Sequence, residues 1–123
     1  MEKQLNKLIK KIIEYIEDKH GNGTKVLDLK NVSTVADFFI VTSGQSTRQT
    51  KVIAKELEER LKDDEVFLKS KEGYETGNWI LLDYGDIIIH IFNDETREFY
   101  NIEKIWKDAN LIYAEDDILN NVQ

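Results

Sequence analysis

The sequence predicts a mixed α/β domain (α+β), in which helices flank a five-stranded mixed sheet. Two stretches, residues 5–16 and 52–61, carry apolar side chains at helical spacing. A third stretch, residues 79–92, consists of two apolar runs on either side of a glycine, which is typical of a β-hairpin. A length of 123 residues without an internal repeat suits one domain with its own core.

The first helix is expected over residues 2–19. Lysine and glutamate stand between its apolar side chains, so one face can pack on a core while the other meets water. Because glycine readily adopts the left-handed conformation that follows a helix, we expect Gly21 to end it. The apolar face consists of Leu5, Leu8, Ile9, Ile12, Ile13 and Ile16.

Two short strands, Lys25–Leu29 and Phe38–Ser43, are expected next, and Gly44 ends the second of them. Ser46 and Gln49 fit a capping box, in which the two side chains satisfy free N–H groups at the start of a helix. A second helix therefore begins here, and its apolar stripe is Val52, Ile53, Leu57 and Leu61.

The remaining three strands are expected between residues 66 and 92. A short strand, Val66–Ser70, precedes a polar loop and then the hairpin, whose turn needs the positive φ that Gly85 can supply. Both alternating sets of side chains in the last strand are largely apolar. Such a strand must be covered on both faces, or on one face with a protein contact on the other. The two sets are Ile87, Ile89 and Ile91, and Ile88, His90 and Phe92.

A last helix is expected from Glu95 to about Lys107, with Asn93 as its cap. Residues 1–108 would then form the domain. Residues 109–123 would form an acidic C-terminal tail that is loosely held.

The charge is unevenly distributed along the chain. Residues from Trp79 onward include 3 basic and 10 acidic side chains, which accounts for the whole net charge of −7. An acidic surface repels phosphate, so no direct nucleic-acid specificity is expected and a charged partner should be basic. The alternative is that the excess charge only aids solubility.

Composition also bounds the setting and the chemistry. The chain contains no cysteine, so it has neither disulfides nor thiolate chemistry. No apolar run approaches the roughly 20 residues that a membrane span needs, and the first eleven residues lack the apolar core of a signal peptide. A cytoplasmic protein without a membrane partner is expected.

Residues that could support catalysis or metal binding have simpler interpretations. The segment Thr42–Thr47 fits neither a nucleophile elbow nor a P-loop, and it suits a strand-to-helix turn. Asp83 and Asp86 flank the hairpin turn, where aspartate is common. His90 lies in an apolar strand, far in sequence from His20, so no metal-ligand spacing exists. We therefore expect no catalytic residue, no metal and no cofactor.

Trp79 and Tyr84 are the large aromatic residues of the hairpin. Strict alternation places them on opposite faces of the first strand, because Trp79 shares its parity with Leu81 and Asp83. At least one of the two could belong to the core. Aromatic anchors on a sheet with two apolar faces are also typical of protein interfaces, so both interpretations stay open.

Three ordered segments resemble the Iojap/RsfS family of ribosomal silencing factors. They are VADFFIVTSGQSTRQ (35–49), WILLDYGDIIIHIF (79–92) and REFYNIEKIW (97–106). The resemblance covers the chain from about Leu5 to Asp108. It departs from the family pattern at Gln49, where histidine is usual, and in a tail that extends past the usual end.

The resemblance implies a fold related in outline to nucleotidyltransferases but without their catalytic residues. It implies a non-enzymatic protein that binds the large ribosomal subunit through a basic ribosomal protein, number fourteen in the standard naming. Bound there, it would sterically block subunit joining and repress translation, and it would form homodimers when free. The family's contact surface, carried over to this sequence, places Trp79, Tyr84, Asp83 and Asp86 in the partner-binding site.

Two other classes of function are compatible with a small mixed α/β domain. A nucleotidyltransferase-like enzyme, degenerate or active, needs two carboxylates on one strand and a glycine-serine turn for the phosphates. Here Ser43 and Gly44 have the reverse order, and the strand Phe38–Ser43 carries no carboxylate. A dimeric adaptor without a ribosomal role is the third class, and sedimentation with large subunits would separate it from the first.

Overall fold

The computed structural model describes residues 2–100 and 110–114. Within these ranges the chain forms three helices and six strands. In chain order they are α1 (Glu2–Asp18), β1 (Asn22–Asp28), β2 (Phe38–Gly44), α2 (Thr47–Asp63), β3 (Ser70–Glu72), β4 (Trp79–Asp83), β5 (Ile87–Asn93), α3 (Asp94–Tyr100) and β6 (Asn110–Ala114). The mixed α/β class is therefore confirmed.

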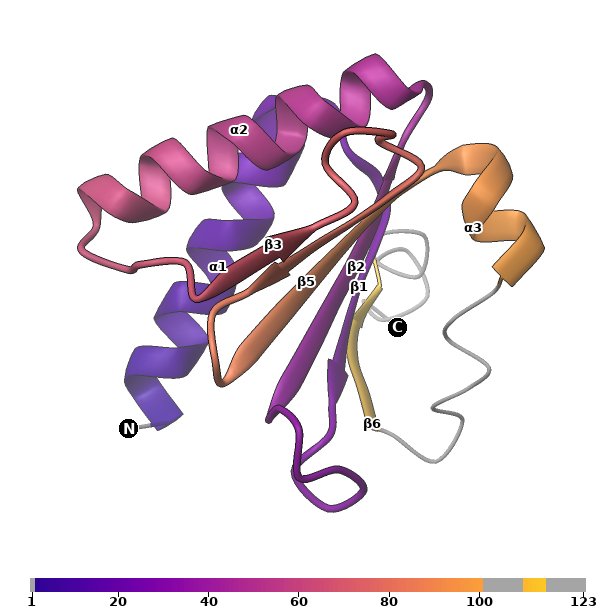
Figure 1. The fold of residues 1–123 in the computed structure, drawn as a ribbon. Helices are drawn as coiled ribbons and strands as arrows, with labels where there is room; N and C mark the ends of the chain where they lie inside the picture. Colours follow the sequence, from indigo (N-terminus) through magenta and orange to yellow (C-terminus); the bar gives the residue numbers. More distant parts are fainter. Residues whose placement is uncertain (1, 101–109, 115–123) are drawn as a thin grey trace, which may run out of the picture.

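The strands form one mixed sheet in the order β3-β4-β5-β2-β1-β6. Only the central pair, β2 and β5, is parallel, with Ile40 opposite Ile89, and the other four pairs are antiparallel. Helices α1 and α2 lie together over one side of this sheet (Figure 1). Strand β4 of the β4–β5 hairpin lies between β5 of the central pair and the short edge strand β3.

The expectation of five strands is wrong, because the sheet has six. The sixth strand, β6, pairs with β1 and lies in the segment that the sequence predicts as a loosely held tail. Its Leu111 and Ile112 remain 44% and 46% exposed, so it carries no strong burial pattern. Long-range pairing with an open sheet edge orders this strand, and local sequence does not report such pairing.

The third strand lies later than expected. Val66–Ser70 was the predicted range, but the paired residues are Ser70–Glu72, all of them exposed on an edge strand. Val66 and Leu68 instead pack on the core from the α2–β3 connection. The alternation of Val66 and Leu68 reports that these two side chains are partly buried. A connecting segment can bury side chains in this way without pairing as a strand.

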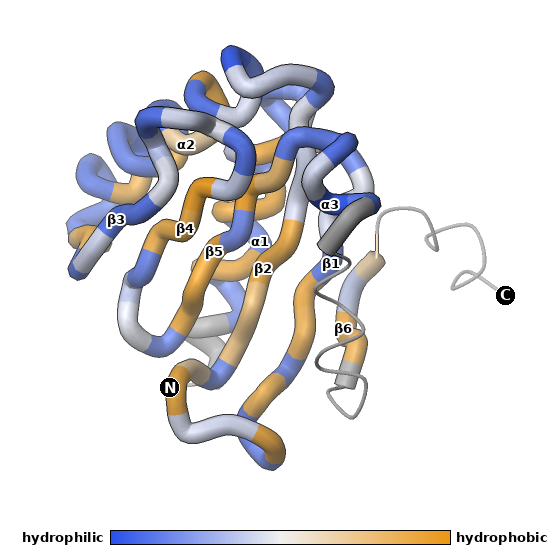
Figure 2. The backbone as a smooth tube through the Cα atoms, turned by 45° about the vertical axis from the view of Figure 1, so that its right-hand side comes forward, coloured by the Kyte–Doolittle hydropathy of each residue, from blue (hydrophilic) through white to orange (hydrophobic). Residues whose placement is uncertain are grey.

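The sheet has apolar clusters on both faces. Figure 2 shows hydrophobic residues running along β2, β4 and β5 in the middle of the sheet. The main core lies beneath α1 and α2 and includes Ile87, Ile89 and Ile91 of β5. The second cluster, on the opposite face, consists of Leu27, Leu29, Ala36, Phe39, Val41, Ile88 and Phe92. The prediction that β5 is covered on both faces is confirmed.

The end of α1 differs from the expectation. His20, with a φ of 64°, takes the left-handed position, and Gly21 does not. The N–H of Gly21 donates to the carbonyl of Ile16 and that of His20 to Glu17, both at 2.9 Å, which makes a Schellman motif. Gly21 is required for space, because a Cβ there would collide with Ile16 and lie 2.9 Å from Thr42 Oγ1.

This arrangement predicts opposite effects for two neighbouring substitutions. His20→Gly should raise the free energy of unfolding by about 0.5–1 kcal/mol, because glycine adopts a positive φ without strain. Gly21→Ala should lower it by roughly 1–3 kcal/mol through overpacking. Urea titrations of both variants beside the wild type would measure the two changes. A loss of stability in His20→Gly would contradict the assignment.

The caps of the next two helices follow the sequence more closely. Ser46 caps α2, since its Oγ accepts the N–H of Gln49 at 3.1 Å. The Gln49 side chain does not complete the capping box and instead donates to the Lys19 carbonyl at the end of α1. Asn93 Oδ1 accepts the N–H of Thr96 at 2.7 Å and so caps α3. The predicted extension of that helix to Lys107 lies outside the described residues.

Candidate docking site on the hairpin

The β4–β5 hairpin is built as the sequence predicts. Trp79 pairs with Phe92 and Leu81 with His90 across the two strands. Gly85 has a φ of 91° at the turn, which confirms the need for glycine there. The N–H of Tyr84 donates to the Ile87 carbonyl at 2.9 Å and closes the turn. The hairpin is therefore a defined platform for the side chains that it carries.

The two aspartates of the turn serve the backbone. Asp83 Oδ1 accepts the N–H of Gly85 at 2.7 Å, which confirms its interpretation as a turn residue. Asp86 has an exposed side chain, and its carbonyl accepts the N–H groups of Asp37 and Phe38 at 2.9 and 3.0 Å. Among the described residues, no three histidine or acidic side chains gather closely enough to hold a metal ion.

Trp79 lies on the second face of the sheet and is half-buried there. Its ring stacks on Phe92 with centroids 4.8 Å apart. Its Nε1 donates to His90 Nδ1 at 3.0 Å. The rest of the indole borders a hollow of about 320 Å³ that is also lined by Glu72, Gly73 and Leu81. A tryptophan fixed in one orientation beside a hollow is a suitable anchor for a partner protein.

Tyr84 lies on the other face, where it packs against the main core. Its hydroxyl is buried and has no hydrogen-bond partner among the described residues. Burial, with a smaller effect from the Glu58 carboxylate, raises the pKa of Tyr84 well above its usual value. The structure therefore does not bring Trp79 and Tyr84 together, in agreement with the alternation in the sequence.

His90 is the residue of this site that sequence reasoning did not connect to Trp79. It is 3% exposed and packs edge-on against Phe39, with centroids 4.5 Å apart. Because Nδ1 accepts the indole N–H, the neutral ring carries its proton on Nε2, which is buried and has no hydrogen-bond partner within the described part of the chain. The cross-strand pairing of positions 81 and 90 was the available signal, since it brings Trp79 diagonally close to His90.

The burial of His90 predicts a pH-dependent stability. Burial lowers its pKa to about 4, below the value of about 6.5 in the unfolded chain. The unfolded chain therefore binds this proton more readily, and the stability present above about pH 6.5 is lost as the pH falls towards 4. Between about pH 7.5 and pH 5 the loss should be roughly 2 kcal/mol.

The test compares urea unfolding of the wild type and of His90→Gln across this pH range. Carboxylates titrate in both proteins, so the difference between the two curves isolates the imidazole. Parallel curves for the two proteins would contradict the predicted role of His90.

The strand-to-helix turn at Thr42–Thr47 has structural partners. The hydroxyls of Thr42 and Thr24 lie 2.8 Å apart in the interior. Ser43 Oγ accepts Arg97 Nη1 at 2.7 Å, and Ser46 caps α2. These contacts agree with the interpretation of the segment as a turn.

The fold and the hairpin define a small mixed α/β domain with a fixed tryptophan beside a surface hollow. The family model described as "Ribosomal silencing factor during starvation" matches residues 2–123. That match includes residues 109–123, which the sequence resemblance placed past the family's usual end. The chain belongs to this family of ribosomal silencing factors, whose name places it in ribosome-associated regulation.

Individual relatives agree with this assignment. The "Ribosomal silencing factor RsfS" of Halalkalibacterium halodurans is 35% identical over 108 residues, which span 88% of this chain and 92% of the relative. A crystal structure of a Chromobacterium violaceum protein matches with a TM-score of 0.80 and 33% identity, over 83% of this chain and 85% of that one. A more distant mouse protein, "Mitochondrial assembly of ribosomal large subunit protein 1", is 26% identical over 77% of this chain and 43% of its own length.

The fold class and the absence of a membrane span are two further expectations from the sequence. The mixed α/β fold agrees with the crystal structure, whereas the outline shared with nucleotidyltransferases stays a prediction. None of the helices in the described ranges is long and apolar enough to cross a membrane.

Proposed function

We propose that this protein docks on the large ribosomal subunit, through the basic ribosomal protein numbered fourteen, and prevents the small subunit from joining. The observation that carries the proposal is the family match over residues 2–123. Occlusion of a surface represses translation without chemistry, so the protein acts as a binding module and not as an enzyme. Its place of action is the cytoplasm.

The hairpin supplies the contact. Trp79 is held by the stack on Phe92 and the hydrogen bond to His90, so little side-chain entropy is lost when a partner covers it. Glu72 borders the same hollow, and Asp86 is exposed at the turn. Glu72 lies beside the anchor, whereas Asp86 lies at the other end of the hairpin from Trp79, and an aromatic anchor with an acidic neighbour suits a basic protein surface.

Tyr84 and Asp83 have a supporting part in this contact. Tyr84 packs beneath the hairpin on the core side, and Asp83 fixes the turn through the N–H of Gly85. Both hold the platform on which Trp79 and Asp86 meet the partner. Homodimers of the free protein use the same apolar surface, so large subunits in excess convert the dimer into a one-to-one complex.

Sedimentation with purified large subunits, followed by a subunit-joining assay, tests the proposal. We expect the protein to sediment with large but not with small subunits, and to reduce the yield of joined ribosomes in proportion to its occupancy. Light scattering of the free protein should report a dimer that large subunits dissociate. Normal joining at full occupancy would overturn the mechanism, and the absence of sedimentation would overturn the partner.

A further inference from the structure

The first half of α2 carries positive charge only. Arg48, Lys51 and Lys55 follow one another at spacings of three and four residues, which places them on one face of the helix. Residues 47–55 include no acidic side chain. None of the three cations forms an ion pair within the described residues. This concentration of charge is unexpected in a chain whose net charge is −7.

The position of these cations is unfavourable for the helix itself. The N-terminal end of a helix carries partial positive charge and is stabilised by acidic residues, yet the first turn of α2 has none. Lys51 and Lys55 are four residues apart and repel one another. A local arrangement that works against the helix, without a compensating ion pair among the described residues, is typical of a functional surface.

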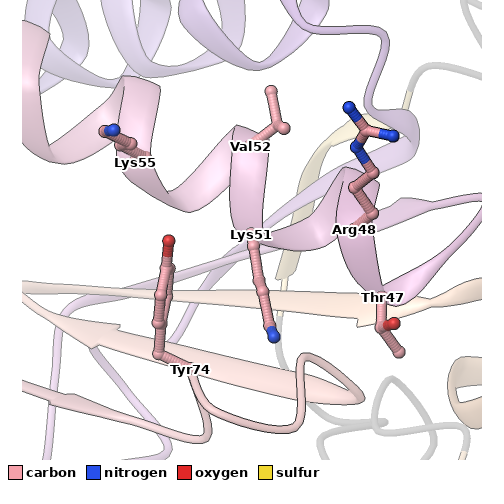
Figure 3. Close-up of a pocket in the computed structure, with 6 residues that line it drawn as sticks. All are labelled: Thr47, Arg48, Lys51, Val52, Lys55 and Tyr74. Carbon is pink, nitrogen blue, oxygen red and sulfur yellow. The ribbon is translucent and has the colours of Figure 1, made fainter.

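The three cations border a hollow of about 290 Å³. Figure 3 shows Arg48, Lys51 and Lys55 along α2, with Tyr74 of the β3–β4 loop facing the helix. The Lys51 ammonium lies 6.0 Å from the centre of the Tyr74 ring, and Lys71, itself paired with Glu58, lies 4.5 Å from it. We call this hollow the basic groove; Lys51 reaches down beside Tyr74, whereas the Arg48 side chain extends away from the ring (Figure 3).

The basic groove lies close to the hollow beside Trp79. A third hollow, within the β3–β4 loop, shares Gly73 with the Trp79 hollow and Tyr74 with the basic groove. The loop is fixed to α2, because Thr50 Oγ1 donates to the Gly77 carbonyl at 2.6 Å. The groove lies on the α2 side of the sheet and the Trp79 hollow on the opposite side, so a partner must reach around the β3–β4 loop to contact both.

We propose that the basic groove binds the phosphate backbone of an RNA strand on the large subunit, beside the contact made by Trp79. This inference rests on the proposed function and adds a second kind of partner to it. Three cations along about 10 Å of helix match several consecutive phosphates, and Tyr74 offers a ring on which a base or ribose can pack. Phosphate contacts position a protein without reading sequence, so no sequence specificity follows.

A negative net charge does not exclude a local phosphate-binding groove. A whole-chain charge of −7 averages over both hollows, whereas RNA responds to the field within about a Debye length, roughly 10 Å at 0.1 M salt. The charged side chains that line the groove are all cations, and the nearby Glu58 carboxylate is paired with Lys71.

The test compares a triple variant of the groove with a matched control. Arg48, Lys51 and Lys55 are changed to glutamine in one protein. Lys7, Lys10 and Lys62, exposed lysines without ion pairs among the described residues, are changed to glutamine in the other. Both proteins lose three positive charges, so a difference between them reports position and not net charge.

Binding to large subunits is measured over a range of salt concentrations. The groove variant should bind at least about tenfold more weakly near 0.1 M salt, and the slope of log K against log salt should fall by about 2–3, or roughly 0.7–0.9 per lost phosphate contact. The control should keep the wild-type slope. Equal losses in the two variants, or unchanged binding of the groove variant, would overturn the proposal.

Isolated RNA separates this proposal from the function on which it rests. If the wild type does not bind large subunits, the proposed function fails, and the groove is judged by anisotropy titrations with a short labelled RNA duplex at low salt. RNA binding that only the groove variant loses supports the groove, and absence of RNA binding overturns it. A polyglutamate peptide of equal length that binds the groove more tightly than RNA would also overturn it, because the partner would then be a protein.

Discussion

Trp79→Glu should lose binding to the large subunit while the domain stays folded. An aromatic anchor contributes roughly 2–4 kcal/mol when truncated, which is a loss of affinity of about 30- to 1000-fold. A carboxylate that is buried against the partner without a counter-charge adds to the loss. The main core lies on the opposite face of β4, so it keeps its packing in this variant. Sedimentation with large subunits and the melting temperature are the two measurements.

Phe67→Glu provides the matched control. Phe67 is 64% exposed and precedes β3, whose pairing of Ser70 with Asp83 puts it near the turn and at the opposite end of β4 from Trp79. The same replacement of an aromatic ring by a carboxylate should therefore leave the Trp79 contact intact. Trp79→Phe keeps a ring on Phe92 and should bind with a smaller loss than Trp79→Glu. A folded Trp79→Glu protein with normal sedimentation would show that the anchor is elsewhere. Unfolding of even Trp79→Phe would make Trp79 a core residue.

Tyr84→Glu, by contrast, should lower stability before it affects binding. The side chain packs on the main core and lies near Glu58, so a carboxylate there is poorly solvated and faces a like charge. An uncompensated buried charge costs roughly 3–5 kcal/mol, a large part of the 5–15 kcal/mol that holds a small domain folded. Thermal and urea unfolding should show a strongly destabilised or unfolded protein.

Tyr84→Phe is the companion variant. It removes only the hydroxyl, which is buried without a hydrogen-bond partner among the described residues, so stability should stay level or rise by up to about 1 kcal/mol. A stable Tyr84→Glu protein that no longer sediments with large subunits would instead place Tyr84 in the interface. That result would reverse the roles that the packing assigns to the two aromatic residues.

The features that local chemistry determines could be predicted from the sequence. The hairpin turn at Gly85, the cap at Ser46 and the two-sided burial of β5 depend on a few neighbouring residues, and all three are confirmed. The alternation along β4 also places Trp79 and Tyr84 on opposite faces correctly, because the pleat of a strand fixes the direction of each side chain.

The features that depend on distant partners could not be predicted. Strand β6 is ordered by pairing with β1, and its short apolar run, residues 111–114, stands in an acidic segment with Leu111 and Ile112 largely exposed. The sequence predicts Gly21 in the left-handed position, but His20 occupies it. The actual reason for glycine at position 21 is the lack of space beside Ile16 and Thr42, and this arises only after α1 packs on β2. The basic groove forms only because Tyr74 approaches α2 in the folded domain. Counting charges along the sequence does not reveal this approach.

The parallel pairing of β2 with β5 also sets an order for biosynthesis. Every residue of β2 is buried in the finished sheet, yet its neighbour on one side is a strand made about half a chain length later. A nascent chain that has released β2 but not residues 87–93 exposes an apolar strand with an unpaired edge, the kind of surface on which other chains aggregate. Truncation before β5 should therefore yield an insoluble fragment and not a smaller domain, and a chaperone that holds β2 during synthesis would cover its unpaired edge until residues 87–93 are available.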